Sequence, residues 1–255
     1  MTDYDRILNY FIKWVGYQEK DSFKHIGESM EKPEDYTAFS GDNNYTIFAK
    51  DFKKLTGIDV QGEPWCDTFI DICFIKVFGL EKAKILLGGF SAYTPDSANY
   101  FKEKNRFIYS PLKGSIVFFK GKRINHTGFT VNFDENYIYT IEGNTSNDDK
   151  FNRNGGCVAR KKHLINSTNI AGYGAINYMK NGWDKDNNTW KYYKNGDIVT
   201  NKNILSNGLS YYVDNEGNMV TGQHFIDGKR RVFNTNGQYE GAELLINDVK
   251  GVKIL

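Results

Sequence analysis

Cysteine and proline are both scarce in this chain of 255 residues. There are three cysteines, Cys66, Cys73 and Cys157, and such an odd, sparse set does not build a disulfide framework. The scarcity excludes the small disulfide-rich secreted class and favours synthesis in a reducing cytosol. All four prolines lie before residue 180, which is the first sign that the two parts of the chain differ.

The sequence also lacks a dominant charge and long apolar runs. Its 33 basic and 31 acidic residues leave a net charge of +2, so we expect neither nucleic acid nor an anionic membrane surface as a partner. No apolar run approaches the roughly 18 to 20 residues that span a bilayer, so membrane insertion is not expected. Charges interrupt the N-terminal segment, which therefore does not resemble a signal peptide.

Apolar side chains are plentiful enough for a sizeable core. Hydrophobic residues make up 40% of the chain and aromatic residues 15%. The composition changes near residue 180, beyond which proline and cysteine are absent and the sequence becomes repetitive. We predict two domains, residues 1–178 and residues 182–255.

The first domain is predicted to be α+β. Apolar residues at helical spacing predict helices over residues 4–15, 45–55 and 64–78, and Gly79 is expected to end the last of them. Short β-branched and aromatic segments after Pro111 predict four strands, over residues 115–119, 128–133, 137–142 and 170–178. Helices followed by such strands indicate helices packed on an antiparallel sheet.

The second domain carries an internal repeat of about 20 residues. A dipeptide ending in glycine recurs at Asn195-Gly196, Glu216-Gly217 and Asn236-Gly237, each after a pair of aromatic or apolar residues. Because Asn-Gly in this setting is a strong hairpin signal, we predict about three hairpins over residues 182–241 with these dipeptides as turns. The hairpins must stack, since one alone cannot bury its apolar face. Residues 242–255 are predicted to be a short tail or a last strand.

Cys66 follows Glu63-Pro64-Trp65 at the predicted start of a helix. Proline suits the first turn of a helix, and the unpaired N–H groups and dipole of that turn stabilise a thiolate. A cysteine there is either a reactive nucleophile or an ordinary buried residue. Cys73, two turns further along the same face, is expected to be an ordinary buried residue.

His126, Glu142 and Asn144 supply the other groups of a nucleophilic site. His126 begins a predicted strand and could take a proton from a thiol. Glu142 and Asn144 alternate along the next extended segment and share a side, so either could orient the imidazole through its second nitrogen. Each polar residue alone could be a turn residue, but their combination with Cys66 points to acyl transfer on cysteine.

No metal and no other cofactor is expected. Cys157 and His163 are six residues apart, and Cys66 and Cys73 are seven apart, which does not match the spacing of zinc ligands. The segment 41–44 carries too few carboxylates for a calcium loop.

Three segments of the first domain resemble the motifs of one family of cysteine enzymes. Trp65-Cys66-Asp67-Thr68-Phe69-Ile70, Asn125-His126-Thr127-Gly128 and Glu142-Gly143-Asn144-Thr145-Ser146 are similar to the motifs of the cysteine, histidine-dependent amidohydrolase/peptidase (CHAP) family, which is common in phage endolysins. The resemblance covers about residues 1–178. It implies a papain-like catalytic domain that cleaves an amide bond in bacterial peptidoglycan, either as an amidase or as an endopeptidase.

The resemblance also implies a role for each matched residue. Cys66 would be the nucleophile, His126 the general base and acid, Glu142 the orienting partner, and Asn144 a further polar support. Trp65 is expected to form a wall of the substrate groove, or else to be a core aromatic. Asp67 stands where the family often has alanine.

The repeats of the second domain resemble the choline-binding-like repeats of endolysins and clostridial surface proteins. The resemblance implies that aromatic side chains bind choline or stack on wall sugars; the candidates are Trp183, Trp190, Tyr192, Tyr193, Tyr211 and Tyr212. The second repeat has Asn203 and Ser210 where two tryptophans would stand, so another wall glycan is at least as plausible a ligand as choline. Self-association through the repeats is a further expectation.

The favoured hypothesis is an endolysin that hydrolyses peptidoglycan and is targeted by its repeats to the wall. We expect it to be made in the host bacterial cytoplasm and to act at the wall after release. The alternatives are a cysteine peptidase or transpeptidase acting on proteins, and a wall-binding protein without catalysis.

Overall fold

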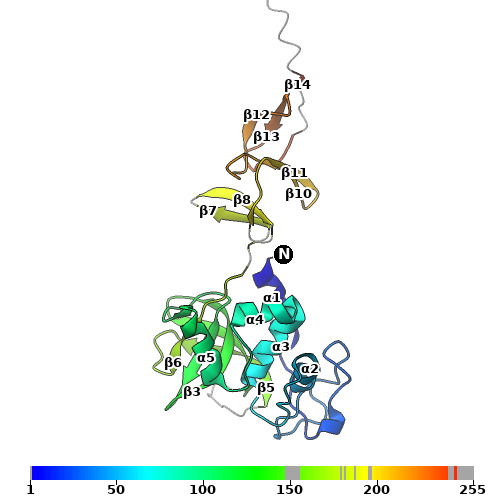
Figure 1. The fold of residues 1–255 in the computed structure, drawn as a ribbon, viewed down its shortest axis with the longest axis vertical. Helices are drawn as coiled ribbons and strands as arrows, with labels where there is room; N and C mark the ends of the chain where they lie inside the picture. Colours follow the sequence, from blue (N-terminus) through cyan, green and yellow to red (C-terminus); the bar gives the residue numbers. More distant parts are fainter. Residues whose placement is uncertain are drawn as a thin grey trace, which may run out of the picture. The chain divides into compact units, whose positions relative to one another are not determined.

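The computed structural model describes residues 2–146, 156–178, 180, 182–186, 188–194, 197–240 and 244–245. The chain divides into two compact units (Figure 1). One comprises residues 4–178, and the other residues 179–255 together with residues 1–3. The division falls where the composition of the sequence changes.

In the larger unit, the described helices all precede the strands of the sheet. They are α1 (Asp3–Lys13), the short 3₁₀ helix η1 (Phe23–His25), α2 (Ile47–Thr56), α3 (Cys66–Phe78), α4 (Leu80–Leu87) and α5 (Thr94–Glu103). The three helices predicted from apolar spacing are confirmed, and each of their ends lies within two residues of the prediction. Gly79 ends α3 as expected, at a φ of 80° that only glycine adopts readily. Pro64 lies just before the helix rather than in its first turn.

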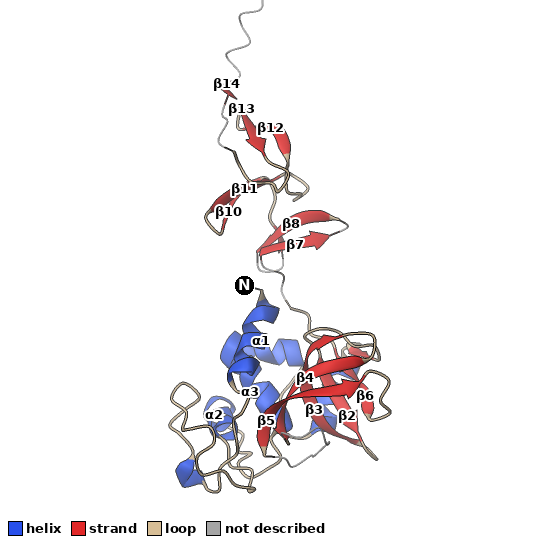
Figure 2. Cartoon of the chain, turned by 180° about the vertical axis from the view of Figure 1, so that it is seen from behind, coloured by secondary structure: helices blue, strands red, loops and turns tan. Residues whose placement is uncertain are grey.

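Six antiparallel strands form one sheet in this unit. They are β1 (Phe107–Ile108), β2 (Ile116–Lys120), β3 (Ile124–Phe133), β4 (Tyr137–Thr145), β5 (Cys157–Leu164) and β6 (Ile170–Gly174). Their order across the sheet is β1-β6-β2-β3-β4-β5. The helices gather beside the sheet (Figure 2), so the predicted α+β class is confirmed.

The helix α3 lies at the centre of the unit. Its first ten residues are all buried, and it contacts α2, α4, β3 and β4. The two faces of the sheet belong to separate apolar clusters. Ile116, Phe129 and Ile141 join the main core with the helices, whereas Phe119 and Ile138, offset by an odd number of residues along their strands, join a smaller cluster. Strand alternation therefore fixes which side chains of β2 and β4 face each cluster.

The second unit is built from small hairpins. The strands are β7 (Gly182–Asp186), β8 (Thr189–Lys194), β9 (Asp197–Ile198), β10 (Lys202–Ser206), β11 (Leu209–Val213), β12 (Gly222–Ile226), β13 (Lys229–Phe233) and β14 (Leu244–Leu245). The pairs β7–β8, β10–β11 and β12–β13 are the three hairpins. The predicted number of hairpins and their period are thus confirmed.

The turns of these hairpins are not where the sequence pattern placed them. The tips lie at Asn207-Gly208 and Asp227-Gly228, where both residues of each pair have positive φ. Two consecutive positive φ values are the requirement of a type I′ turn. Gly217 and Gly237, also at positive φ, lie instead in the segments that follow a hairpin. The third predicted turn, Asn195-Gly196, lies outside the described residues.

Successive hairpins are joined by a repeated backbone contact. The N–H of Met219, in the segment after the second hairpin, donates to the carbonyl of Trp190 in the first, at 2.8 Å. Twenty residues further on, the N–H of Tyr239 donates to the carbonyl of Ser210, also at 2.8 Å. The repeat therefore sets the stacking as well as the hairpins themselves.

Candidate functional site

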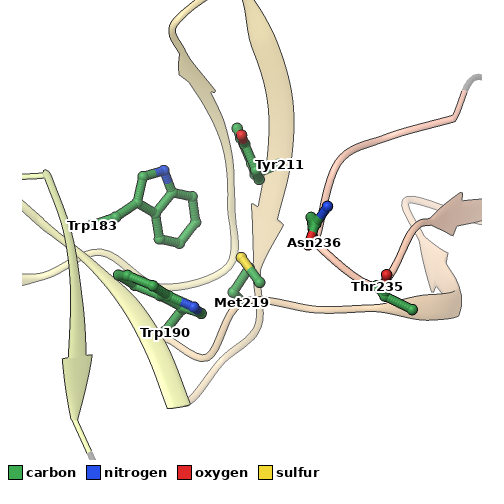
Figure 3. Close-up of a pocket in the computed structure, with 6 residues that line it drawn as sticks. All are labelled: Trp183, Trp190, Tyr211, Met219, Thr235 and Asn236. Carbon is green, nitrogen blue, oxygen red and sulfur yellow. The ribbon is translucent and has the colours of Figure 1, made fainter. Parts of the chain in front are cut away.

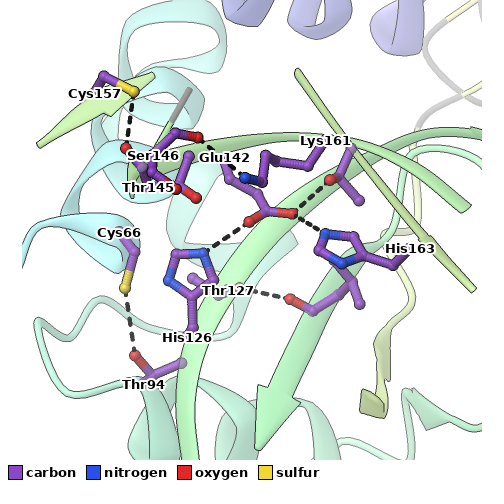
Figure 4. Close-up of polar contacts among 12 residues, drawn as sticks. Cys66, Thr94, His126, Thr127, Glu142, Thr145, Ser146, Cys157, Lys161 and His163 are labelled. Atoms are coloured by element: carbon purple, nitrogen blue, oxygen red, sulfur yellow. Dashed lines mark hydrogen bonds and ion pairs between the residues drawn. The ribbon is translucent and has the colours of Figure 1, made fainter. Parts of the chain in front are cut away.

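Cys66 is the first residue of α3, and only 4% of its surface is exposed. The N–H groups of the first turn of a helix have no acceptor within that helix, so they face outward beside the sulfur. The Sγ atom lies 3.8 Å from the Oγ1 atom of Thr94, the first residue of α5 (Figure 4). None of the three cysteines forms a disulfide, and the thiol of Cys157 donates to the carbonyl of Thr145.

His126 and Glu142 are joined by a buried hydrogen bond. His126 Nε2 lies 2.9 Å from Glu142 Oε2, and both side chains are completely buried. A carboxylate only accepts hydrogen bonds, so Nε2 carries the proton and Nδ1 is the nitrogen left for other chemistry. Figure 4 shows the second nitrogen of the ring directed toward the Cys66 sulfur. The three residues thus come together from α3, β3 and β4.

The protonation of His126 and that of Glu142 both depend on the side chains they contact. Burial lowers the pKa of His126, but hydrogen bonds to Cys66 and Glu142 outweigh it and raise that pKa to about 10. Burial raises the pKa of Glu142, and the hydrogen bonds from His126 and His163 more than reverse this, so the pKa ends below its ordinary value. The site therefore favours an imidazolium held between a sulfur and a carboxylate.

Two further donors reach the other oxygen of Glu142. His163 Nε2, from β5, lies 2.6 Å from Oε1, and the hydroxyl of Thr140 donates to the same oxygen at 2.5 Å. His163 was considered in the sequence only as a metal ligand and set aside. Its strand, β5, is rich in lysine and arginine and was not predicted, so no signal linked it to Glu142.

Two glycines of the matched motifs make room for this arrangement. A Cβ atom on Gly128 would lie 2.6 Å from Cγ of Glu142, and one on Gly143 would lie 2.8 Å from Cβ of Phe69 in α3. Neither glycine has a positive φ. Glycine is therefore required at these positions because other groups approach closely: the Glu142 side chain approaches β3 at Gly128, and α3 approaches β4 at Gly143.

A cavity of about 250 Å³ opens beside Cys66. It is lined by Glu63, Pro64, Cys66, Ala92, Tyr93, Thr94, Pro95, Arg123, Ile124 and Asn125. An acidic and a basic side chain, Glu63 and Arg123, therefore share one pocket with the sulfur, and the Arg123 guanidinium lies 5.6 Å from the centre of the Tyr93 ring. The segment around Tyr93 lies beyond the three matched motifs, so its place in the pocket was not expected.

Two predicted site residues lie elsewhere than expected. Trp65 does not line the cavity: it is completely buried, its indole N–H donates to Glu19 at 2.8 Å, and its ring packs on Phe48 and Tyr17. The predicted groove wall is therefore corrected to the alternative, a core aromatic. Asn144 is buried at a φ of 52°, and its amide atoms have no hydrogen-bond partner among the described residues. Of the two candidate partners for the imidazole, the structure thus pairs Glu142 with His126.

Aromatic rings of the second unit surround a pocket of about 310 Å³. It is lined by Trp183, Trp190, Tyr211, Met219, Thr235 and Asn236 (Figure 3). The ring centres of Trp183 and Tyr211 are 5.1 Å apart in an edge-on arrangement, so three aromatic rings from two neighbouring hairpins line one pocket. Three of the six aromatic candidates are found here, whereas Met219, Thr235 and Asn236 were not foreseen.

The other three aromatic candidates serve different purposes. Tyr192 packs edge-on against Trp183, with ring centres 5.1 Å apart, and Tyr193 is nearly buried. Both line a second cavity of about 330 Å³ with Ile204 and other residues of the next hairpin. The hydroxyl of Tyr212 donates to Asn201 at 2.8 Å, and its ring packs on the apolar cluster of the third hairpin.

Two absences can be stated for the described part of the chain. It contains no group of three histidine, cysteine, aspartate or glutamate side chains placed to hold a metal ion. None of its helices combines the length and the apolar character that crossing a membrane requires.

Comparison with known proteins gave partial structural likenesses only. No protein-family model matches the chain, and no curated protein does. A multimodular pneumococcal cell wall endolysin from phage Cp-1, complexed with choline, is 24% identical over 26% of this chain and 19% of its own, with a TM-score of 0.24. The choline-binding domain of Spr1274 from Streptococcus pneumoniae is 29% identical over 24% of this chain and 74% of its own, with a TM-score of 0.23.

Choline binding protein F from Streptococcus pneumoniae is 19% identical over 50% of this chain and 51% of its own, with a TM-score of 0.23. This chain spans about a fifth of the phage endolysin's length. TM-scores this low do not establish a shared overall fold.

Proposed function

We propose that the larger unit is a papain-like cysteine hydrolase of the CHAP type and that it cleaves an amide bond in bacterial peptidoglycan. The observation that carries the proposal is the buried connection from Cys66 through His126 to Glu142, at the start of a helix and beside an open cavity. A nucleophile, a base and a group that orients the base are the parts that nucleophilic acyl transfer requires.

Each part has a defined task in this proposal. Cys66 Sγ attacks the amide carbonyl carbon, and its proton is held on Nδ1 of His126. The Sγ–C bond forms, and the C–N bond breaks as Nδ1 returns the proton to the leaving amine. Water, deprotonated by the same nitrogen, then attacks the thioester and releases Cys66. The Cys66 N–H, free of an acceptor within α3, is the candidate donor to the oxyanion.

The cavity supplies features suited to a peptide substrate. Arg123 can pair with a substrate carboxylate, and Glu63 can pair with an ammonium group. Peptidoglycan stem peptides carry both kinds of group. Because Trp65 is buried, the apolar wall of the groove is assigned to Tyr93, Pro95 and Ile124.

We further propose that the second unit binds a wall polymer through the aromatic pocket. The faces of two tryptophans and one tyrosine, with a methionine beside them, suit a quaternary ammonium group, which is bound by cation–π attraction. Choline on a wall glycan is such a ligand, whereas a neutral sugar would stack on one face. The positions 20 residues after the three aromatic residues of the pocket are occupied by residues that are not aromatic: Asn203, Ser210 and Arg231. The repeat therefore provides one such cage among the described residues.

The catalytic proposal is tested with purified peptidoglycan and a matched pair of cysteine variants. Cys66→Ala should abolish the release of amino groups from the walls. Cys73→Ala, which alters a core cysteine of α3, should retain it. The same proteins in gels containing cell walls or casein separate a wall hydrolase from a cysteine peptidase acting on proteins. Activity that persists in Cys66→Ala would refute the proposal.

The binding proposal is tested on the full chain. Trp190→Ala removes one face of the cage, and its ring is 41% exposed, so little core packing is lost. We expect it to reduce sedimentation with host walls, whereas Phe225→Ala, at an exposed aromatic of β12 outside the pocket, should bind normally. Elution of the wild-type chain by free choline would identify a quaternary ammonium ligand. Equal binding by both variants would refute the pocket assignment.

A further inference from the structure

Glu142 holds two imidazole rings rather than one. Its Oε2 atom accepts from His126 at 2.9 Å, and its Oε1 atom accepts from His163 at 2.6 Å (Figure 4). Because a carboxylate only accepts, both rings present a protonated Nε2 to it. The carboxylate is therefore fixed by one imidazole N–H on each of its two oxygens.

The second ring lies nearer to solvent than the first. The side chains of His126 and Glu142 have no exposed surface, whereas that of His163 is 16% exposed. Phe119 on β2 packs against both rings, with centres 5.8 Å from His126 and 4.6 Å from His163. His163 is thus the partly exposed member of a contact whose other two members, His126 and Glu142, are completely buried.

Two further charged side chains of the described part of the chain lie near this cluster. Lys161 lies two residues before His163 on the same face of β5, and its ammonium donates to the carbonyl of Ser146 at 3.0 Å. Asp67, in the first turn of α3, interacts electrostatically with His126. Glu142 is the carboxylate that contacts both rings directly, so a change at one ring also affects the carboxylate that the other ring contacts.

We propose that His163 is a positioning residue for the Cys66–His126–Glu142 group: its N–H fixes the Glu142 carboxylate in the orientation in which that carboxylate accepts from His126. The assignment rests on the proposed function. It adds a fourth residue, outside the matched motifs, on which the reactivity of Cys66 depends.

The physical consequence concerns the reactivity of Cys66. A carboxylate that loses the donor on its Oε1 atom can turn away from His126, and the imidazolium at His126 then loses part of the charge that stabilises it. His126 would hold the proton from Cys66 less firmly, so a variant without a donor at position 163 should form the reactive thiolate less readily than the wild type.

The test uses two replacements and one control. His163→Gln keeps an N–H donor that does not titrate, and His163→Phe keeps an aromatic ring without a donor. His25→Gln is the matched control, because His25 also contacts a carboxylate, Asp21 at 2.6 Å, but lies outside the site. Thermal melting verifies that each variant is folded. The rate of Cys66 alkylation by iodoacetamide is then followed from pH 5 to 8, together with hydrolysis of purified walls.

We expect His163→Gln, which keeps a donor to Oε1, to be alkylated at Cys66 at nearly the wild-type rate and to hydrolyse walls nearly as well at pH 7. We expect His163→Phe to slow the alkylation of Cys66 across the pH range and to lower wall hydrolysis at pH 7 by roughly 10- to 100-fold, the value of one hydrogen bond to a charged group. Alkylation of His163→Phe at the wild-type rate, as in the His25 control, would overturn the inference. Alkylation needs no wall substrate, so slowed alkylation of His163→Phe together with a wild type that hydrolyses no walls would overturn the proposed function alone.

Discussion

Replacing Glu142 by glutamine perturbs the proposed mechanism at its most buried point. Glutamine has nearly the same shape but no charge, and its NH₂ group would face one of the donors that now converge on the carboxylate. Burial lowers the pKa of His126, but the interactions with Cys66 and Glu142 outweigh burial and raise this pKa from 6.5 to about 10. At 1.36 kcal/mol for each unit, this rise is about 5 kcal/mol of preference for the imidazolium.

If Glu142 supplies roughly half of that preference, its loss removes about 2–3 kcal/mol and lowers kcat/KM by about a hundredfold. The assay is the initial rate of amino-group release from purified peptidoglycan at pH 7, with melting temperatures recorded alongside. Glu34→Gln is the matched control, since Glu34 also accepts from a hydroxyl and a backbone N–H outside the site. A rate within threefold of the wild type for Glu142→Gln, with an unchanged pH profile, would refute the reasoning.

Three more predictions follow from the same contacts. Iodoacetamide near neutral pH should label Cys66 long before Cys73, because burial raises the pKa of the Cys73 thiol; equal labelling, measured by peptide mass spectrometry, would contradict an activated Cys66. Gly128→Ala should impair hydrolysis with a small change in melting temperature, since the added methyl group displaces Glu142, whereas Gly121→Ala, whose methyl group would meet only the Asn125 side chain at 3.9 Å, should behave as the wild type. The raised pKa of His126 means that its stabilising charge is fully present below about pH 6.5 and is lost as the pH rises through about 10. Chemical unfolding should therefore show the wild type losing stability across this window and Glu142→Gln losing less; parallel curves would count against the ion pair.

Local signals predicted much of the larger unit. The segment 64–78 shows apolar residues and an ending glycine, and it forms α3 with the cysteine at its start. The strands that carry His126 and Glu142 were also recognised, although β3 begins at Ile124, before the predicted start. By contrast, β5 carries three consecutive basic residues, Arg160, Lys161 and Lys162, which hide its alternation. The role of His163 depends on that strand and could not be inferred without it.

The repeat domain shows a different limit of sequence reasoning. Its period of about 20 residues predicts the number of hairpins, but two glycine-containing dipeptides occur in each period. Asn207-Gly208 and Asp227-Gly228 form the tips because exactly two residues there separate paired strands. Gly217 and Gly237 satisfy the same local rule and are used in the connections. Only strand pairing decides between them, and pairing is a tertiary property.

The burial of Trp65 has a similar cause. An aromatic residue beside a nucleophile suits a groove wall, and the sequence favoured that position. The buried carboxylate of Glu19, 46 residues earlier in the chain, instead accepts from its indole N–H and holds the ring in the core. A single long-range polar contact therefore decides which way the side chain points.

The central claim is that Cys66 forms a covalent acyl intermediate with a wall amide. The most direct measurement is intact-mass spectrometry of the chain after brief exposure to soluble peptidoglycan fragments and acid quenching, followed by peptide mapping. The account predicts an added mass on the peptide containing Cys66, matched to one released amine, and no such adduct in Cys66→Ala. Fragments that are cleaved normally while Cys66 stays unmodified, or cleavage by Cys66→Ala, would contradict it.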